Sequence, residues 1–224
     1  MLRNILALFV LVTMAATVSL AQTIVGSKHD LSTGGGITNK STNETQVCIF
    51  CHTPHQTTVT ATPLWNKVLS SQASYGVYAS SSMNATPADI GGGTGTSNLC
   101  MSCHDGTVAV NNLGNKSTFG VPTMGSGVEL DATGKIAAGR DANLGTSLTN
   151  DHPINFDYDA TLATNDGGLV TPVSTAWVDA AHTIPLYGAK VQCASCHDAH
   201  KSTHGSFMRK SNAASALCVT CHTK

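Results

Sequence analysis

Cys48-Ile49-Phe50-Cys51-His52 is the first of four Cys-x-x-Cys-His pentapeptides, and these motifs decide how the chain folds. The others are Cys100-Met101-Ser102-Cys103-His104, Cys193-Ala194-Ser195-Cys196-His197 and Cys218-Val219-Thr220-Cys221-His222. The chain has eight cysteines, so every cysteine belongs to a motif. On one helical turn, positions i, i+3 and i+4 share a face, which places both sulfurs and the imidazole beside one flat ring.

These residue types at this spacing are the attachment motif of haem c. Two thiols add to the porphyrin vinyl groups as thioethers, and the histidine that follows becomes an axial ligand of the iron. The expected thioether positions are Cys48, Cys51, Cys100, Cys103, Cys193, Cys196, Cys218 and Cys221. The expected proximal iron ligands are His52, His104, His197 and His222. The sequence therefore predicts four covalent c-type haems per chain.

Cys-x-x-Cys pairs also occur in zinc sites and in redox dithiols. Four pairs are enough for two zinc sites, and a dithiol of the thioredoxin type needs only one pair. Neither kind of site needs a histidine directly after the second cysteine, whereas that histidine follows all four pairs. Haem attachment accounts for the motif better than either alternative.

Residues 1–21 have the pattern of a secretory signal peptide. Arg3 supplies an early positive charge, the run from Ile5 to Val18 is mostly apolar, and Ser19 and Ala21 suit a cleavage site. The apolar run is short for a membrane span, so a retained anchor is the less favoured alternative. We expect a mature chain of residues 22–224, without a membrane span, exported to the extracellular space or the outer cell surface. The periplasm is the alternative location.

The composition leaves little material for an ordinary hydrophobic core. Aromatic residues make up 5% of the chain and charged residues 11%, and there are 21 glycines. Haem macrocycles supply large apolar surfaces, so we expect a multihaem cytochrome c fold: mostly irregular loops, with few short helices and strands, wrapped around a stacked haem chain. The net charge of −1 gives no support for nucleic-acid binding.

The motifs fall into two pairs within one tetrahaem domain, residues 22–224. The pairs occupy residues 48–104 and 193–222, and a connecting segment without cysteine, residues 105–192, lies between them. Alternating Ile154, Phe156 and Tyr158 predict a strand, and Val191 is expected to end another. Short helices are expected at residues 63–74 and 174–181.

Six histidines lie outside the motifs, and four irons need four further ligands if all are six-coordinate. His55 and His200 each follow a motif histidine by three residues. The porphyrin plane separates such a residue from the opposite face of the same iron, so each is expected to serve a neighbouring haem. The favoured distal ligands are His29, His55, His152 and His200.

His152 precedes Pro153, which restricts it to an extended conformation, and Asp151 is placed to orient its ring. His182 and His204 stay open as alternative ligands. Thioether ligation is a further alternative, through Met83, Met101, Met124 or Met208.

With these features, the sequence resembles the multihaem cytochromes with doubled Cys-x-x-Cys-His motifs, and more narrowly the OmcE-type tetrahaem cytochromes of iron-reducing bacteria. The resemblance covers nearly the whole mature chain. It rests on Gly26-Ser27-Lys28-His29-Asp30-Leu31-Ser32, Cys48 to His55 with Pro63-Leu64-Trp65-Asn66, Cys100 to Ala109, Asn150-Asp151-His152-Pro153-Ile154, Cys193 to His200 and Leu217 to His222. It implies four bis-histidine haems in a continuous stack. In OmcE-type members it also implies extracellular filaments, in which one haem takes an axial histidine from the neighbouring subunit.

Electron transfer is the expected function, through four bis-histidine haems, and the chain is not expected to be an enzyme. We expect a subunit of an extracellular filament that delivers electrons to external acceptors, with other redox proteins and further copies of itself as partners. A soluble periplasmic electron carrier needs the same haems and stays open as an alternative. A multihaem reductase needs an iron with an open sixth position, which the surplus of histidines disfavours.

Overall fold

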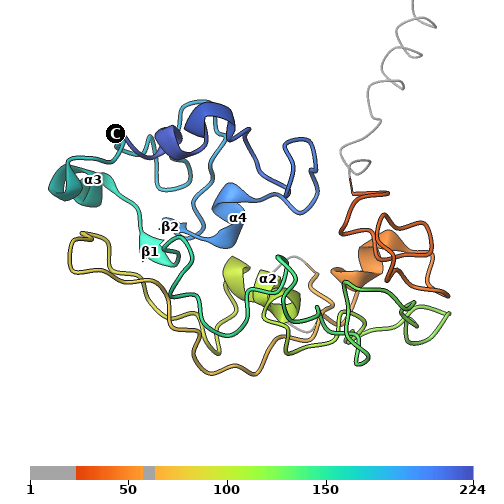
Figure 1. Ribbon diagram of the computed structural model, residues 1–224. Coiled ribbons are helices and arrows are strands. Elements are labelled where there is room, and N and C mark those ends of the chain that lie inside the picture. The colour runs from red at the N-terminus through yellow and green to blue at the C-terminus, as the bar shows by residue number, and fades with distance from the viewer. Residues whose placement is uncertain (1–23, 58–63, 224) are drawn as a thin grey trace, which may run out of the picture.

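The computed structural model describes residues 24–57 and 64–223, so the expected signal peptide lies outside the described residues. Turns and loops dominate the described chain, as the composition predicted (Figure 1). The regular elements are η1 (Val47–Phe50), α2 (Thr96–His104), β1 (Phe156–Asp157), α3 (Ala160–Asp166), β2 (Lys190–Val191), α4 (Cys193–Cys196), η2 (Ala213–Ser215) and η3 (Cys218–Thr220). None of the described helices is long and apolar enough to cross a membrane.

Two small apolar cores hold the loops together. The first core surrounds the antiparallel pair β1 and β2, in which Phe156 lies opposite Val191. Its buried members are Phe156, Tyr158, Leu162, Val178, Ile184, Leu186 and Val191. The second core surrounds α2 and consists of Tyr75, Ile90, Met101 and Leu148. Met101 is therefore a packing residue, which removes it from the alternative thioether ligands.

The carboxy-terminal and amino-terminal parts of the chain lie on opposite sides of the two central helices, α2 and α4. Figure 1 shows α3 on one side and the red-to-orange segment on the other. That segment pairs with the connecting segment, since Ser41 forms a bridge with Met124 and the Asn39 amide donates to the Gly125 carbonyl at 2.9 Å. Helices α2 and α4, which carry residues of the second and third motifs, thus occupy the middle of the molecule.

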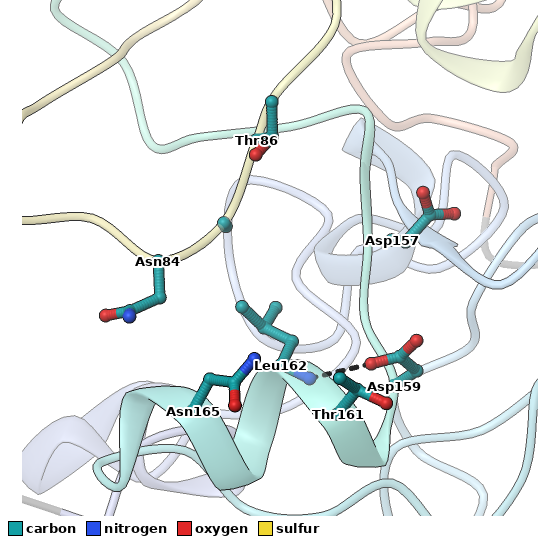
Figure 2. Close-up of a pocket in the computed structure, with 8 residues that line it drawn as sticks. Asn84, Thr86, Asp157, Asp159, Thr161, Leu162 and Asn165 are labelled. Carbon is teal, nitrogen blue, oxygen red and sulfur yellow. Dashed lines mark hydrogen bonds between the residues drawn. The ribbon is translucent and has the colours of Figure 1, made fainter.

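Helix α3 was not anticipated from the sequence, although both its ends carry recognisable signals. The Asp159 carboxylate accepts a hydrogen bond from the Leu162 N–H at 2.7 Å (Figure 2). Gly167 ends the helix at φ +68°. A cavity of about 230 Å³ lies beside the helix. Its lining includes Asn84, Thr86 and Asp157 but no residue of the four motifs.

The helices expected at residues 63–74 and 174–181 are wrong for the residues that the structure describes. The Thr53 N–H donates to the Leu64 carbonyl, and the Asn66 N–H to the Cys51 carbonyl, each at 2.8 Å. Val178 is fully buried, and its N–H donates to the Ile184 carbonyl at 3.0 Å. Because these backbone groups bond to other segments, they are not available for helical hydrogen bonds.

Candidate haem-binding sites

Each pentapeptide forms a helical turn. In the first, third and fourth motifs the histidine N–H donates to the carbonyl of the first cysteine; the pairs are His52 with Cys48 at 2.8 Å, His197 with Cys193 at 3.1 Å, and His222 with Cys218 at 2.9 Å. The second motif is the carboxy-terminal end of α2. None of the eight cysteines forms a disulfide. In residues 24–57 and 64–223, no group of three His, Cys, Asp or Glu side chains is placed to hold a metal ion.

Helices α2 and α4 contact each other through their motifs. The Cys193 N–H donates to the Ser97 hydroxyl at 3.0 Å, and that hydroxyl donates to the Gln192 side chain. The Cys100 and Cys193 thiols also hydrogen-bond each other, which lowers the pKa of Cys193 to about 7 and raises the pKa of Cys100. The attachment points of the second and third motifs are therefore in direct contact.

The outer motifs lie near the inner ones. Burial raises the pKa of the Cys51 thiol to about 12, and the neighbouring Cys103 raises it further. Burial also raises the pKa of Cys196, with smaller increments from Cys193 and Cys218. Short segments also link each outer motif to its neighbour. The Asn66 N–H donates to the Cys51 carbonyl at 2.8 Å, while Lys67 donates to the Ala109 carbonyl at 2.7 Å. The Arg209 N–H donates to the Cys196 carbonyl at 2.8 Å, while Lys210 donates to the Thr220 hydroxyl at 2.9 Å.

Three motif histidines each face a histidine from a distant part of the chain. The ring centroids are 6.0 Å apart in His52 and His200, 6.1 Å apart in His104 and His29, and 6.4 Å apart in His222 and His152. Two imidazoles that bind opposite sides of one metal through nitrogen, at about 2 Å each, place their centroids about 6 Å apart. The donor set at these three motifs therefore fits hexacoordinate haem iron.

Backbone carbonyls orient several of these rings through Nδ1. The contacts are His104 with Ala142 at 2.7 Å, His152 with Pro153 at 2.8 Å and His197 with Ser206 at 2.8 Å. An Nδ1–H that donates to a carbonyl leaves the lone pair of Nε2 for a metal. The ring of His152 is thus oriented by the Pro153 carbonyl, where the sequence had suggested Asp151.

Burial keeps the pair formed by His29 and His104 neutral. Burial, followed by the charge of His104, lowers the pKa of His29 to about 4. Burial also lowers the pKa of His104, against the hydrogen bond to the Ala142 carbonyl, which raises it. Neutral imidazole is the form that binds a metal, so both rings are ready to act as ligands near neutral pH.

Aromatic rings that support the histidines were not identified from the sequence. Phe207 stacks on His29 with centroids 4.1 Å apart and ring planes at 13°. Trp65 meets His52 edge-on at 5.9 Å. The low number of large aromatic residues was a signal that the sequence did offer. The chain has only five phenylalanines and two tryptophans, so each of them is a candidate for a specific packing role.

His197 differs from the other motif histidines. All ten histidines lie in the described residues, and within these no ring contact joins His197 to a second histidine. His55, an expected distal ligand, is exposed. His182 stacks on Trp177 with centroids 5.0 Å apart, and His204 is exposed. Six of the eight expected ligands are therefore brought together in pairs, and His55 and His197 are not.

Residues 187–224, which contain the third and fourth motifs, match the profile of the doubled CXXCH motif. No match was found among curated protein sequences. The matched motif and the eight cysteines support covalent binding of haem c and a role in electron transfer. The chain thus carries the doubled attachment motif that supports a place among the multihaem c-type cytochromes.

Proposed function

We propose that this chain binds four haems c, one at each motif, and conducts electrons through them without making or breaking a bond of a substrate. The carrying observation is that three motif histidines each face a second histidine at 6.0 to 6.4 Å. An iron with two histidine ligands has no open position for a substrate. Haem iron supplies reversible one-electron transfer, and the protein sets its ligands and surroundings.

The motif histidines are the proximal ligands in this proposal, and three distal ligands come from elsewhere in the chain. His200 serves the first haem, His29 the second and His152 the fourth. Carbonyl oxygens hold the Nδ1 side of His104, His152 and His197, so that Nε2 of each ring is directed away from the backbone. Ligand exchange is slowed by this fixed orientation.

A continuous electron path is supported by the contacts between motifs. The thiols of Cys100 and Cys193 touch, which places the second and third attachment points together. The first motif is linked to the second by Asn66, whose N–H donates to the Cys51 carbonyl, and by Lys67, whose ammonium donates to the Ala109 carbonyl. Electrons would then pass along the motifs in the order of the sequence.

The finer proposal is an exported filament in which the third haem takes its sixth ligand from a neighbouring copy of the chain. His55 is the donor, because it is exposed and its loop is held in place. The Asn115 side chain donates to the carbonyls of His55 and Gln56, at 3.1 and 2.6 Å. Each subunit contact would thereby complete one haem, and the filament would deliver electrons to external acceptors.

Carbon monoxide binding tests this proposal, because reduced haem binds it only where the sixth position is open. We expect four haems per chain, one carbon monoxide per chain in monomers, and almost none in filaments. His55→Ala should abolish filaments and keep one reactive haem, whereas His204→Ala, also an exposed histidine, should change neither property. Monomers that bind no carbon monoxide would instead identify a soluble carrier with four closed haems.

A multihaem reductase is the second candidate. The observation that favours it is that no second histidine faces His197 in the described residues. An iron at this motif with no sixth protein ligand would accept a small oxyanion such as nitrite. Rapid, repeated oxidation of the reduced monomer by nitrite, blocked by carbon monoxide, would favour the enzyme over the conduit.

A further inference from the structure

Lys67 is a buried cation in a chain with few charged side chains. Its exposed fraction is 1%, and its Nζ donates to the Ala109 carbonyl at 2.7 Å and contacts the Asn112 carbonyl at 3.5 Å. Lysine is rarely buried to this degree, because an ammonium group loses strong hydration when it leaves water. A buried ammonium group at this position therefore indicates that Lys67 has a role in the surrounding site.

The backbone places Lys67 between the first and second motifs. The N–H of the preceding residue, Asn66, donates to the Cys51 carbonyl at 2.8 Å. Lys67 itself forms a bridge with Leu113, and its ammonium reaches Ala109, shortly after the motif that ends at His104. The ammonium group thus lies between the segment that contacts the first motif and the segment that follows the second motif.

Asp105 is the charged group of opposite sign nearby, and it is 3% exposed. Its carboxylate accepts hydrogen bonds from the Tyr75 hydroxyl and the Thr107 N–H, each at 2.8 Å. Burial dominates the raised pKa of the Cys103 thiol; Lys67 is the next influence and lowers it, and it outweighs Asp105, which raises it. Lys67 and Asp105 therefore act on the second attachment point with opposite signs.

We propose that Lys67 tunes the redox potentials of two haems: its fixed positive charge raises the reduction potentials of the haems at the first and second motifs. This inference rests on the proposed haem binding. Reduction adds one electron to iron and removes one positive charge from the haem, so a nearby cation favours the reduced form. A unit charge that acts over about 10 Å at an effective dielectric constant of about 20 would change the ratio of reduced to oxidised haem about tenfold.

Three variants separate this role from simple satisfaction of the Ala109 carbonyl. Lys67→Met removes the charge and the donor, and Lys67→Gln removes the charge but keeps a donor. Lys116→Met is the matched control, because it removes an exposed cation that water and salt screen. If Lys67 acts through its charge, both neutral variants at position 67 shift the potentials, and the donor of Gln does not restore them.

The measurement is a spectroelectrochemical titration of the full haem-loaded chain, with haem content and the low-spin spectrum recorded for each variant. We expect about a tenfold fall in the ratio of reduced to oxidised haem at fixed potential, about 59 mV for a one-electron couple, in half of the absorbance change. Lys116→Met should leave the whole curve unchanged.

Several results would overturn the inference while leaving the proposed function intact. They are full haem content with an unshifted titration in both neutral variants, recovery of the original curve by Lys67→Gln, or failure of both neutral variants to incorporate haem at the first two motifs. Absence of haem from the unmodified protein would instead overturn the proposed function.

Discussion

Helices α2 and α4 each contain both cysteines of a Cys-x-x-Cys-His motif and contact each other, yet the histidines of the two motifs have different surroundings. His104, at the end of α2, faces His29 at 6.1 Å. His197, directly after α4, has no histidine facing it in the described part of the chain, although its Nδ1 contacts the Ser206 carbonyl at 2.8 Å. The motif therefore prepares a proximal histidine in both places, but it does not supply the second one.

The loop that carries His29 accounts for the difference. Asp30 is fully buried, and its carboxylate accepts hydrogen bonds from the Gly26 N–H at 2.8 Å and from the Ser32 hydroxyl at 2.6 Å. These hydrogen bonds fix the conformation of the loop, so that the ring of His29 lies beside His104 at the end of α2. His197 is exposed, whereas His104 is half-buried. The ring of His29 also contacts the segment after α4, at the Ala199 carbonyl at 3.5 Å, but its ring faces His104.

Removal of His29 should abolish the contrast between the two motifs. In His29→Ala the iron at His104 loses its facing ligand, so we expect one additional haem per chain to bind carbon monoxide after reduction. His182→Ala is the control, because that ring stacks on Trp177 and faces no motif histidine. Unchanged carbon monoxide binding in His29→Ala would remove His29 from the ligands.

Ser97 tests the physical link between the two helices. Its fully buried hydroxyl accepts from the Cys193 N–H and donates to Gln192, so Ser97→Ala leaves buried polar groups unpaired. We expect a loss of about 1–3 kcal/mol in the free energy of unfolding, measured by denaturant titration followed by circular dichroism.

Ser102→Ala is the matched control for Ser97→Ala. Ser102 is equally buried, but its hydroxyl donates to the Leu99 carbonyl within α2, so its loss breaks no link to α4. Equal destabilisation by the two substitutions would show that the link has no special role.

Phe207 sharpens the comparison at the distal ligand of α2. Phe207→Leu removes the ring stacked on His29, a contact of about 0.5–1.5 kcal/mol, and leaves the imidazole freer to rotate. We expect one of the low-spin signals in the electron paramagnetic resonance spectrum to shift or broaden. Phe119→Leu, at an exposed phenylalanine, should leave all signals in place. A spectrum unaltered by Phe207→Leu would contradict the positioning of His29 by this ring.

Asp89 makes the support of α2 sensitive to acid. Burial raises its pKa, but hydrogen bonds from the Ser74 hydroxyl and from the N–H groups of Gly91, Gly76 and Tyr75 outweigh burial and lower the pKa to about 2. A carboxyl with a depressed pKa stabilises the fold above its ordinary value of 3.8, and this contribution is lost as the pH falls towards 2.

Asp89→Asn should therefore lower the thermal midpoint at pH 7, by about 2–4 °C for each kcal/mol lost, because Tyr75 packs in the core around α2. The difference from the unmodified protein should shrink between about pH 4 and pH 2. Thermal unfolding followed at several pH values measures it, and a difference independent of pH would argue against the charged carboxylate.

Local structure was predictable where short-range chemistry decided it. The helical turn of each motif follows from its spacing, and β1 lies within the alternating run Ile154, Phe156 and Tyr158. Helix α3 was not predicted, although Asp159 and Gly167 are standard signals at its two ends. The expected helix at residues 63–74 failed in its described part, because Leu64 and Asn66 bond to the first motif instead of to their own segment.

The sequence by itself determined the attachment chemistry, since four pentapeptides of the pattern Cys-x-x-Cys-His place cysteine and histidine on one turn by local geometry alone. It also narrowed the distal ligands to a few histidines. Only the tertiary structure decided which of them meet: His29 reaches His104, His200 reaches His52 and His152 reaches His222. These pairs join residues far apart in the chain, and their formation depends on loop packing and buried hydrogen bonds that no local pattern encodes.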